Sequence, residues 1–231
     1  MTIIIIKTIL LCILAYLIGA IPSGVIISKK VFGFDIRTKG SGNMGSTNTS
    51  RVLGTKWGII VQILDILKGV ISVLVLANII GRNWNMFGED SFLSLHILEI
   101  MVGISAVLGH IFSCFIKFKG GKGINTALGM LVAIIPIETI AALSIFAIVV
   151  GISGYVSLGS MIAATTLPIN LLIRQNCLKF EIDGYLTMMY FLLVFVVLIL
   201  IKHKSNIDRL IKGYENKMEK MQFMRRKKTQ K

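Results

Sequence analysis

The stretch GINTALGMLVAIIPIETIAALSIFAIVVGISG, residues 123–154, decides how this chain folds. It is almost entirely apolar, and Pro136 lies near its middle. An α-helix of about 20 apolar residues crosses the hydrocarbon core of a bilayer, which is about 30 Å thick. Because proline interrupts helices, the stretch is either one long membrane helix or two shorter helices.

Similar apolar runs occupy most of the remaining chain. Of its 231 residues, 55% are hydrophobic, and the mean hydropathy is +0.81, whereas a soluble domain is about 45–50% apolar. This pattern predicts an all-α protein, a polytopic membrane bundle of about seven transmembrane helices. The expected spans are 3–27, 57–79, 97–117, 124–138, 139–154, 155–173 and 184–201.

The distribution of positive charge predicts the orientation of the bundle. Lysine and arginine are concentrated after the first span, after the third span and after the last span. Such segments stay on the cytoplasmic side of a membrane. Two spans, 155–173 and 184–201, separate the second basic segment from the third, so residues 123–154 cross the membrane an even number of times. The chain therefore has seven spans, or five spans and a re-entrant hairpin, with its N-terminus outside and its C-terminus in the cytoplasm.

The formal net charge of +14 is a value that nucleic-acid-binding proteins also reach. Here the basic residues lie between or after apolar spans, where membrane topology places them, so no nucleic-acid partner is expected. Anionic lipid head groups and phosphorylated substrates remain as partners for this charge. Cys12, Cys114 and Cys177 are too scattered to indicate a disulfide framework or a metal site, and no metal or cofactor is expected.

The sequence predicts one membrane-embedded domain, residues 1–215, and a basic, flexible cytoplasmic tail, residues 216–231. The first apolar run lacks both a charged segment before it and a cleavage site after it, so it is expected to remain as a helix. From Lys202 the chain is predicted to begin an amphipathic helix that lies against the membrane. The cluster Arg225–Lys228 is expected to contact anionic lipid.

A first polar segment, GSGNMGSTNTSR at residues 40–51, is dense in glycine, hydroxyl and amide groups. Glycines let backbone N–H groups converge on an anion, and Arg51 can present a planar fork to a phosphate. Gly40-x-Gly42-x-x-Gly45 matches a dinucleotide fingerprint, but no βαβ unit surrounds it. The segment is predicted to bind phosphate, and a flexible polar loop is the alternative.

A second segment, Gly120-Gly121-Lys122-Gly123, opens an apolar helix. Helix N-termini attract phosphate through their free N–H groups and the positive end of the dipole, and Lys122 adds a charge. The spacing differs from that of a Walker A loop. The alternative is a glycine hinge with a lysine that only sets topology. His110, ten residues before Gly120, lies within or near a span. An ionisable residue there either serves function or holds helices together.

A third segment follows the last span, where His203 and Asn206 are three residues apart and share a helix face. His203-x4-Asp208 also matches the histidine–aspartate motif of acyl-CoA-dependent acyltransferases, and we interpret that match as a coincidence because no accompanying blocks occur. Asp65 and Lys68 lie within one span at the same spacing. Buried charges of opposite sign in a span are expected to pair.

The three segments, in this order, resemble the integral-membrane PlsY family, the acyl-phosphate:glycerol-3-phosphate acyltransferases. The similarity extends over nearly the whole chain. Further blocks that carry it are Ala20–Gly24, Leu64–Gly69, Gly109–His110, Tyr155–Leu158, Gly213 and Glu215. The resemblance implies seven membrane helices and an enzyme that moves a fatty acyl group from acyl phosphate to the 1-hydroxyl of sn-glycerol 3-phosphate. The products would be lysophosphatidic acid and phosphate, in the first step of bacterial phospholipid synthesis.

The resemblance also implies a set of site residues. Those carried over as catalytic are Ser41, Arg51, Lys122, His203 and Asn206. Those carried over as substrate-binding are Gly40, Gly42, Asn43, Thr47, Asn48, Gly120, Gly121, Gly123, Thr126 and Ser157. The partners expected for the chain are glycerol 3-phosphate, acyl phosphate, membrane lipid and the enzyme that makes acyl phosphate. The active site is expected at the cytoplasmic face of the cell's inner membrane.

The chain departs from the family pattern at three serines: Ser113 replaces a usual proline, Ser46 an alanine and Ser205 a glutamate. The acceptor of the hydroxyl proton is either His203 or a substrate phosphate, and we favour the phosphate. A transporter or flippase of an organic phosphate or phospholipid is the alternative function. It is disfavoured because the polar residues crowd one membrane face and no internal repeat is visible.

Overall fold

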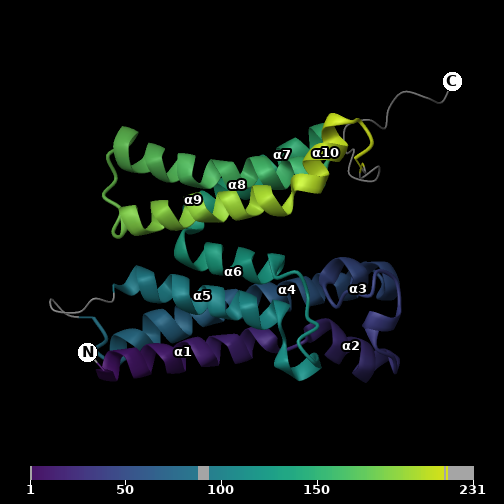
Figure 1. Ribbon diagram of the computed structural model, residues 1–231, viewed down its shortest axis with the longest axis horizontal. Helices are drawn as coiled ribbons and strands as arrows, with labels where there is room; N and C mark the ends of the chain where they lie inside the picture. The colour runs from purple at the N-terminus through teal and green to yellow at the C-terminus, as the bar shows by residue number, and fades with distance from the viewer. Residues whose placement is uncertain (1, 88–93, 216, 218–231) are drawn as a thin grey trace. The chain divides into compact units, whose positions relative to one another are not determined.

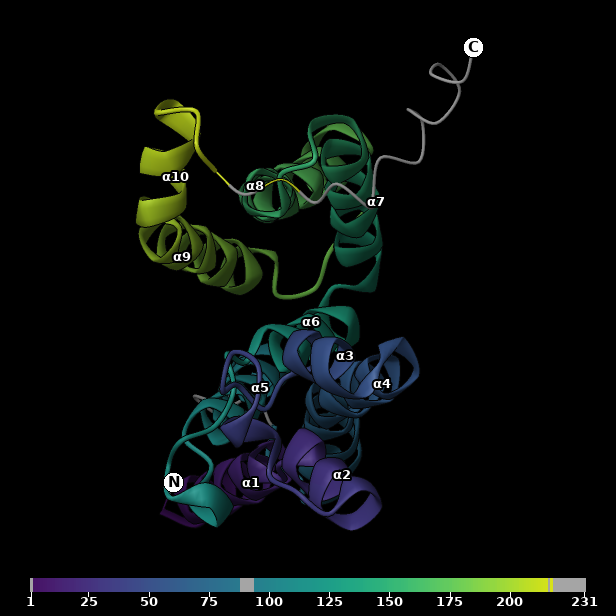
Figure 2. The same cartoon turned by 90° about the vertical axis from the view of Figure 1, so that its right-hand side faces the viewer.

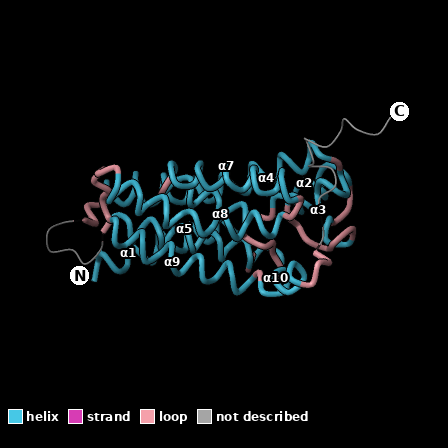
Figure 3. Tube along the Cα trace, turned by 90° about the horizontal axis from the view of Figure 1, so that it is seen from above, coloured by secondary structure: helices cyan, strands magenta, loops and turns pink. Residues whose placement is uncertain are grey.

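The computed structural model describes residues 2–87, 94–215 and 217, and these residues form helices joined by loops, with no strand among them (Figure 3). The chain divides into two compact units, Met1–Ile135 and Pro136–Lys231. The division falls at Pro136, inside the stretch that decides the fold. The predicted all-α class is confirmed.

The first unit contains α1 to α6 (Figure 1). Its helices are α1 (Thr2–Ala20), α2 (Ser23–Phe32), α3 (Ser46–Leu53), α4 (Thr55–Ile71), α5 (Leu95–Ile111) and α6 (Ile124–Ile134). A π-helical segment, Ser72–Gly81, prolongs α4. Within this unit α1 packs on α5, and α4 packs on both α3 and α6, as the end-on view of Figure 2 also shows.

The second unit contains α7 to α10. Its helices are α7 (Pro136–Ser153), α8 (Val156–Leu172), α9 (Tyr185–Lys202) and α10 (Lys204–Ile211). Here α8 packs on α7 and on α9, and a π-helical turn, Ile173–Cys177, ends α8. The predicted amphipathic helix after Lys202 is present as α10. The predicted lipid contact of Arg225–Lys228 lies outside the described residues.

Six helical segments of the described chain are long and apolar enough to cross a membrane. They are Thr2–Phe32, Thr55–Gly81, Leu95–Ile116, Pro136–Ser153, Val156–Cys177 and Tyr185–Lys202. Leucine, isoleucine and valine side chains remain exposed along them, as expected for helices whose outer faces contact lipid. Helix α6 is apolar but has only 11 residues, a rise of about 16 Å at 1.5 Å per residue.

Two helix boundaries differ from the predicted ones, and both lie at proline. The first span, predicted as 3–27, is two helices, because Pro22 lacks an N–H donor and disfavours helix at the residue before it. The Ala20 carbonyl at this break accepts a hydrogen bond from the hydroxyl of Ser113. The spans predicted as 124–138 and 139–154 meet at Pro136 instead, where proline starts α7 as a first helical residue.

Glycines bring α4 and α6 into backbone contact. A Cβ atom on Gly69 of α4 would lie 2.2 Å from the Thr126 carbonyl oxygen, and one on Gly129 of α6 would lie 1.9 Å from the Ile66 carbonyl oxygen. Small residues permit this close approach between membrane helices. The contact holds the start of α6, and the turn before it, beside the last two turns of α4.

Candidate active site

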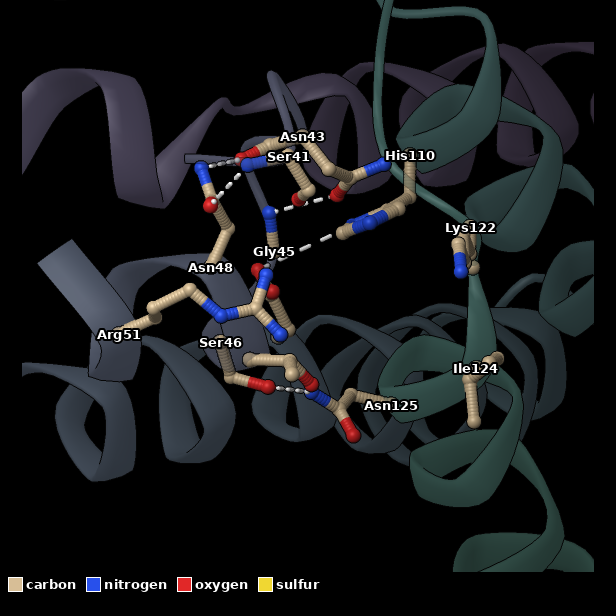
Figure 4. Close-up of a pocket in the computed structure, with 13 residues that line it drawn as sticks. Ser41, Asn43, Gly45, Ser46, Asn48, Arg51, His110, Lys122, Ile124 and Asn125 are labelled. Atoms are coloured by element: carbon tan, nitrogen blue, oxygen red, sulfur yellow. Dashed lines mark hydrogen bonds and ion pairs between the residues drawn. The ribbon is translucent and has the colours of Figure 1, made fainter. Parts of the chain in front are cut away.

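A cavity of about 280 Å³ lies in the first unit, where the loop before α3, the end of α5 and the start of α6 meet (Figure 4). It is lined by Ser41, Asn43, Gly45, Ser46, Thr47, Asn48, Arg51, Asp65, His110, Lys122, Gly123, Ile124 and Asn125. The first and second polar segments of the sequence therefore share one cavity.

The loop of residues 40–45 is anchored by one buried apolar side chain. Met44 is buried in a small cluster with Val25, Ile36 and Ile116. A methionine amid glycine and polar residues gives the loop an anchor, since burying such a side chain contributes about 1.5–3 kcal/mol. The polar groups on either side of Met44 are thereby held at the cavity wall.

Asn48, the third residue of α3, organises the same loop through hydrogen bonds. Its Nδ2 amide donates to the carbonyl oxygens of Ile36, Lys39 and Asn43 at 3.3, 3.1 and 2.8 Å, and its Oδ1 accepts from the Ser41 N–H at 2.8 Å. The side chain is almost fully buried. Asn48 was predicted to bind substrate, but its amide is already occupied by the loop, so we assign it to shaping the site.

Two cations face the cavity. Arg51 comes from the last turn of α3, and Lys122 comes from the turn before α6; they lie on opposite sides in Figure 4. Within the described part of the chain neither forms an ion pair. Cations without carboxylate partners in a concave polar site are suited to bind anions such as phosphate.

The Gly120–Gly123 turn is docked on the end of α5. The N–H of Gly121 donates to the His110 carbonyl at 3.0 Å, and the N–H of Gly120 donates to the Ile111 carbonyl at 3.0 Å. Gly123 caps α6 with a φ of 75°, in the left-handed region that favours glycine. The first N–H groups of α6 lack intrahelical partners, and Gly123, Ile124 and Asn125 line the cavity beside them.

A side-chain hydrogen bond joins the two polar segments. The amide of Asn125 on α6 donates to the Ser46 hydroxyl on α3 at 3.0 Å. Ser46 is one of the three serines that depart from the family pattern, and an alanine there could not make this bond. Sequence reasoning missed Asn125 as a site residue, although it lies within the glycine-turn segment.

Several predicted substrate-binding residues do not line this cavity. Thr126 is fully buried between α6 and α4, so its predicted contact with substrate is not supported by its position. Gly40 has a φ of 61° and lies against the Asn48 side chain. Gly121 instead contacts His110, and Ser157 belongs to the second unit.

Gly42 and Gly120 line a second, more open pocket of the first unit, together with Asp35, Arg37, Thr38 and Lys119. Arg37 donates to both carboxylate oxygens of Asp35, at 3.0 and 2.8 Å, and holds the pKa of that carboxyl well below its usual range. Arg37 is thus neutralised by a neighbour, unlike Arg51 and Lys122. This contrast favours the first cavity as the anion site.

The third polar segment lies in the second unit. His203 is at the junction of α9 and α10, with its Nδ1 atom 2.9 Å from the Ile199 carbonyl oxygen. Asp208, which a coincidental motif paired with His203, is bonded to Lys212 at 2.9 Å instead. That geometry agrees with our rejection of the motif.

Glu215 joins Asn206 to Ser157. Its carboxylate accepts hydrogen bonds from Asn206 Nδ2 at 2.7 Å, Ser157 Oγ at 2.8 Å and Arg209 Nε at 2.6 Å. These hydrogen bonds, the one from Asn206 most strongly, lower the pKa of the Glu215 carboxyl, although partial desolvation acts to raise it. Two predicted site residues are thus held by an acid that the sequence indicated only through the resemblance.

Comparison with known proteins identifies the family to which this geometry belongs. The family model described as glycerol-3-phosphate acyltransferase matches residues 9–213. The chain belongs to the glycerol-3-phosphate acyltransferase family. The resemblance drawn from the three polar segments is therefore confirmed.

Relatives named glycerol-3-phosphate acyltransferase extend over nearly all of the chain. One from Fusobacterium nucleatum is 41% identical over 207 residues, covering 90% of this chain and 96% of the relative. One from Chlorobium phaeobacteroides is 38% identical over 225 residues, covering 89% and 94%. The chain is thus an acyltransferase of this family.

Solved structures support the same conclusion for the fold. A crystal structure of PlsY (YgiH), an integral membrane glycerol 3-phosphate acyltransferase in its glycerol 3-phosphate form, matches with a TM-score of 0.69 and 35% identity. The match covers 93% of this chain and 96% of that one. The lysophosphatidic acid form of that protein matches equally well, at 34% identity. Together with the six long apolar helical segments found among the described residues, this makes the chain a multi-pass membrane protein.

Proposed function

We propose that this chain transfers a fatty acyl group from acyl phosphate to the 1-hydroxyl of sn-glycerol 3-phosphate, releasing lysophosphatidic acid and phosphate. The cavity carries the proposal, because it is lined by two cations, Arg51 and Lys122, that form no ion pair with any described residue. Both substrates bear phosphate groups, so the site needs many cationic and N–H donors. The glycerol 3-phosphate and lysophosphatidic acid forms of the related PlsY support the acceptor and the product.

Acyl phosphate is the donor in this proposal. It is an activated mixed anhydride, so the hydroxyl oxygen attacks the acyl carbon directly, an ester bond forms and the bond to the phosphate oxygen breaks. The departing phosphate takes the hydroxyl proton, which balances the reaction without a metal, a cofactor or a covalent enzyme intermediate. Holding hydroxyl and carbonyl in register supplies up to about 7–11 kcal/mol.

Each site residue has a role in this reaction. Arg51, Lys122 and the loop of Ser41 bind the phosphate groups, with the predicted neighbours Asn43, Thr47 and Gly123 beside them. His203 and Asn206 orient the acceptor. Donors aimed at the developing oxyanion contribute about 3 kcal/mol each.

The proposed topology has seven crossings, the N-terminus outside, and all three polar segments on the cytoplasmic side of the cell's inner membrane. Residues 1–215 act as one acyltransferase domain, followed by a basic cytoplasmic tail, residues 216–231. The enzyme that makes acyl phosphate is the expected supplier of the donor.

The deciding experiment uses the purified chain in lipid with acyl phosphate and glycerol 3-phosphate, and it measures lysophosphatidic acid and free phosphate. Equal amounts of the two products are expected. A parallel reaction supplies acyl-CoA in place of acyl phosphate. Turnover with the thioester alone contradicts the proposed donor.

His203→Gln tests the proton acceptor. If phosphate accepts the proton, this variant weakens the use of glycerol 3-phosphate but retains measurable turnover at saturation. Complete loss of turnover with glycerol 3-phosphate binding intact identifies His203 as the base instead.

A further inference from the structure

Three ionisable residues from the membrane-spanning helices form a buried cluster at the inner wall of the cavity. Asp65 and Lys68 come from α4, and His110 comes from the end of α5; the three residues are 2%, 5% and 3% exposed. Asp65 and His110 both line the cavity. Ionisable groups at such a depth are costly and commonly serve function.

A carboxylate beside a phosphate site would repel the phosphate unless its charge is neutralised. Asp65 Oδ1 accepts a hydrogen bond from Lys68 Nζ at 2.6 Å, and Lys68 Nζ also donates to the Ile21 carbonyl at 2.6 Å. This ion pair neutralises Asp65, so the carboxylate does not oppose the field of Arg51 and Lys122. The predicted pairing of Asp65 with Lys68 is confirmed.

The same carboxylate faces the imidazole of His110. The His110 Nδ1 atom lies 3.8 Å from Asp65 Oδ1, and it is buried without a hydrogen-bond partner in the described structure. Figure 4 shows the imidazole in the cavity wall between the Ser41 loop and the turn that bears Lys122. Asp65 is thus the charged group placed to orient this ring.

The opposite edge of the ring contacts the glycine turn. A Cβ atom on Gly121 would lie 2.2 Å from His110 Nε2, and the Gly121 N–H already donates to the His110 carbonyl at 3.0 Å. Gly121 therefore lies against the His110 ring and is hydrogen-bonded to the His110 backbone. Gly121 directly precedes Lys122.

We propose that His110, oriented by Asp65, is a positioning residue that fixes the Gly120–Lys122 turn and so sets where the Lys122 ammonium group meets a substrate phosphate. The inference rests on the proposed function of Lys122. It is more specific than a role in helix packing, because it predicts an energetic coupling between His110 and one cation of the cavity.

A double-mutant cycle tests this coupling with His110→Gln, Lys122→Ala and the double variant, each assayed for kcat and KM with both substrates. Misplacing a binding group lowers catalytic efficiency by up to about a hundredfold. We expect His110→Gln to raise the KM of the same phosphorylated substrate as Lys122→Ala does. In the double variant the loss of catalytic efficiency should exceed the larger single loss by less than about threefold, because the effects of substitutions at coupled residues are not additive.

The possible outcomes distinguish a failure of this inference from a failure of the proposed function. If the loss in the double variant equals the product of the two single losses, and Lys122→Ala alone impairs the kinetics, the positioning role is overturned. The proposed function then remains intact. A Lys122→Ala variant with unchanged kinetics overturns both the phosphate assignment of Lys122 and the inference. Absence of acyl transfer in the unmodified chain overturns the proposed function itself.

Two further variants guard against misfolding. His96→Gln on α5 is the matched control, since His96 also lies beside a buried carboxylate, at 3.0 Å from Glu99, and is not part of the cavity lining; its kinetics should be unchanged. If His110→Gln does not fold, Asp65→Asn with Lys68→Met removes both charges of the ion pair together and leaves the histidine unoriented. Unchanged KM values in that double variant overturn the role of Asp65.

Discussion

At the scale of single residues, Asn48 shows how one side chain replaces secondary structure in a loop. Asn48→Ala removes the amide that holds three carbonyls and the Ser41 N–H. Leaving buried backbone groups unpaired costs about 1–3 kcal/mol, so we expect a lower melting temperature in detergent and a large loss of kcat/KM. Asn176→Ala is the control, because that exposed amide makes weaker bonds, at 3.2 and 3.3 Å. Equal effects of the two substitutions contradict the role of Asn48.

Glu215 gives a second prediction at this scale, through pH. Its pKa lies below the ordinary 4.5, so its stabilising contribution is complete above that pH and disappears as the pH falls through the folded pKa. Glu215→Gln should lower the melting temperature at pH 7 by about 2–4 °C. The difference in melting temperature between this variant and the unmodified protein should disappear in acid below pH 4.5. As a control, Asp208→Asn removes an exposed carboxylate paired with Lys212, and it should change the melting temperature little at either pH. If the difference caused by Glu215→Gln persists in acid, the Glu215 network does not provide the stabilisation.

At the scale of helices, the contact of α4 with α6 places the phosphate-binding turn. Gly129→Ala would put a Cβ atom 1.9 Å from the Ile66 carbonyl oxygen, so the two helices must separate. We expect a loss of kcat/KM of about tenfold or more, since misplacement of binding groups is amplified in catalysis. Gly151→Ala on α7 is the matched control, because a Cβ atom there meets nothing within 4 Å, and alanine favours a helix over glycine. A loss shared by both variants would indicate a general effect of alanine on these helices.

The same scale shows what the sequence could predict. Apolar length predicted the long helices, and helical spacing predicted the Asp65–Lys68 pair, because both are local properties. The split at Pro22 was missed since the apolar run continues across it. Thr126 and Asn48 were carried over to substrate binding through the family resemblance, which does not tell whether a side chain is already bonded or buried. Those positions depend on contacts between distant segments, which no local pattern encodes.

At the scale of the whole molecule, the proposed function depends on how often the chain crosses the membrane. Helix α6 rises about 16 Å, short of a bilayer core of about 30 Å, whereas α7 is long enough to cross. If α6 did not cross and α7 did, the tail with Asn206 would lie on the opposite side from Lys122. The distribution of lysine and arginine opposes that arrangement. We therefore expect α6, with the residues that flank it, to complete a crossing.

Single-cysteine labelling in intact cells decides this. In a chain with Cys12, Cys114 and Cys177 replaced, Phe180→Cys lies in the exposed loop between α8 and α9, and an impermeant maleimide should label it from outside. Lys39→Cys, before α3, and Lys212→Cys, after α10, should react only once the membrane is permeabilised, because both flank proposed cytoplasmic segments. If Lys212→Cys reacts from outside while Lys39→Cys does not, Asn206 and Lys122 cannot act on one substrate molecule. Activity in the same cysteine variants shows that the labelled protein is the functional form.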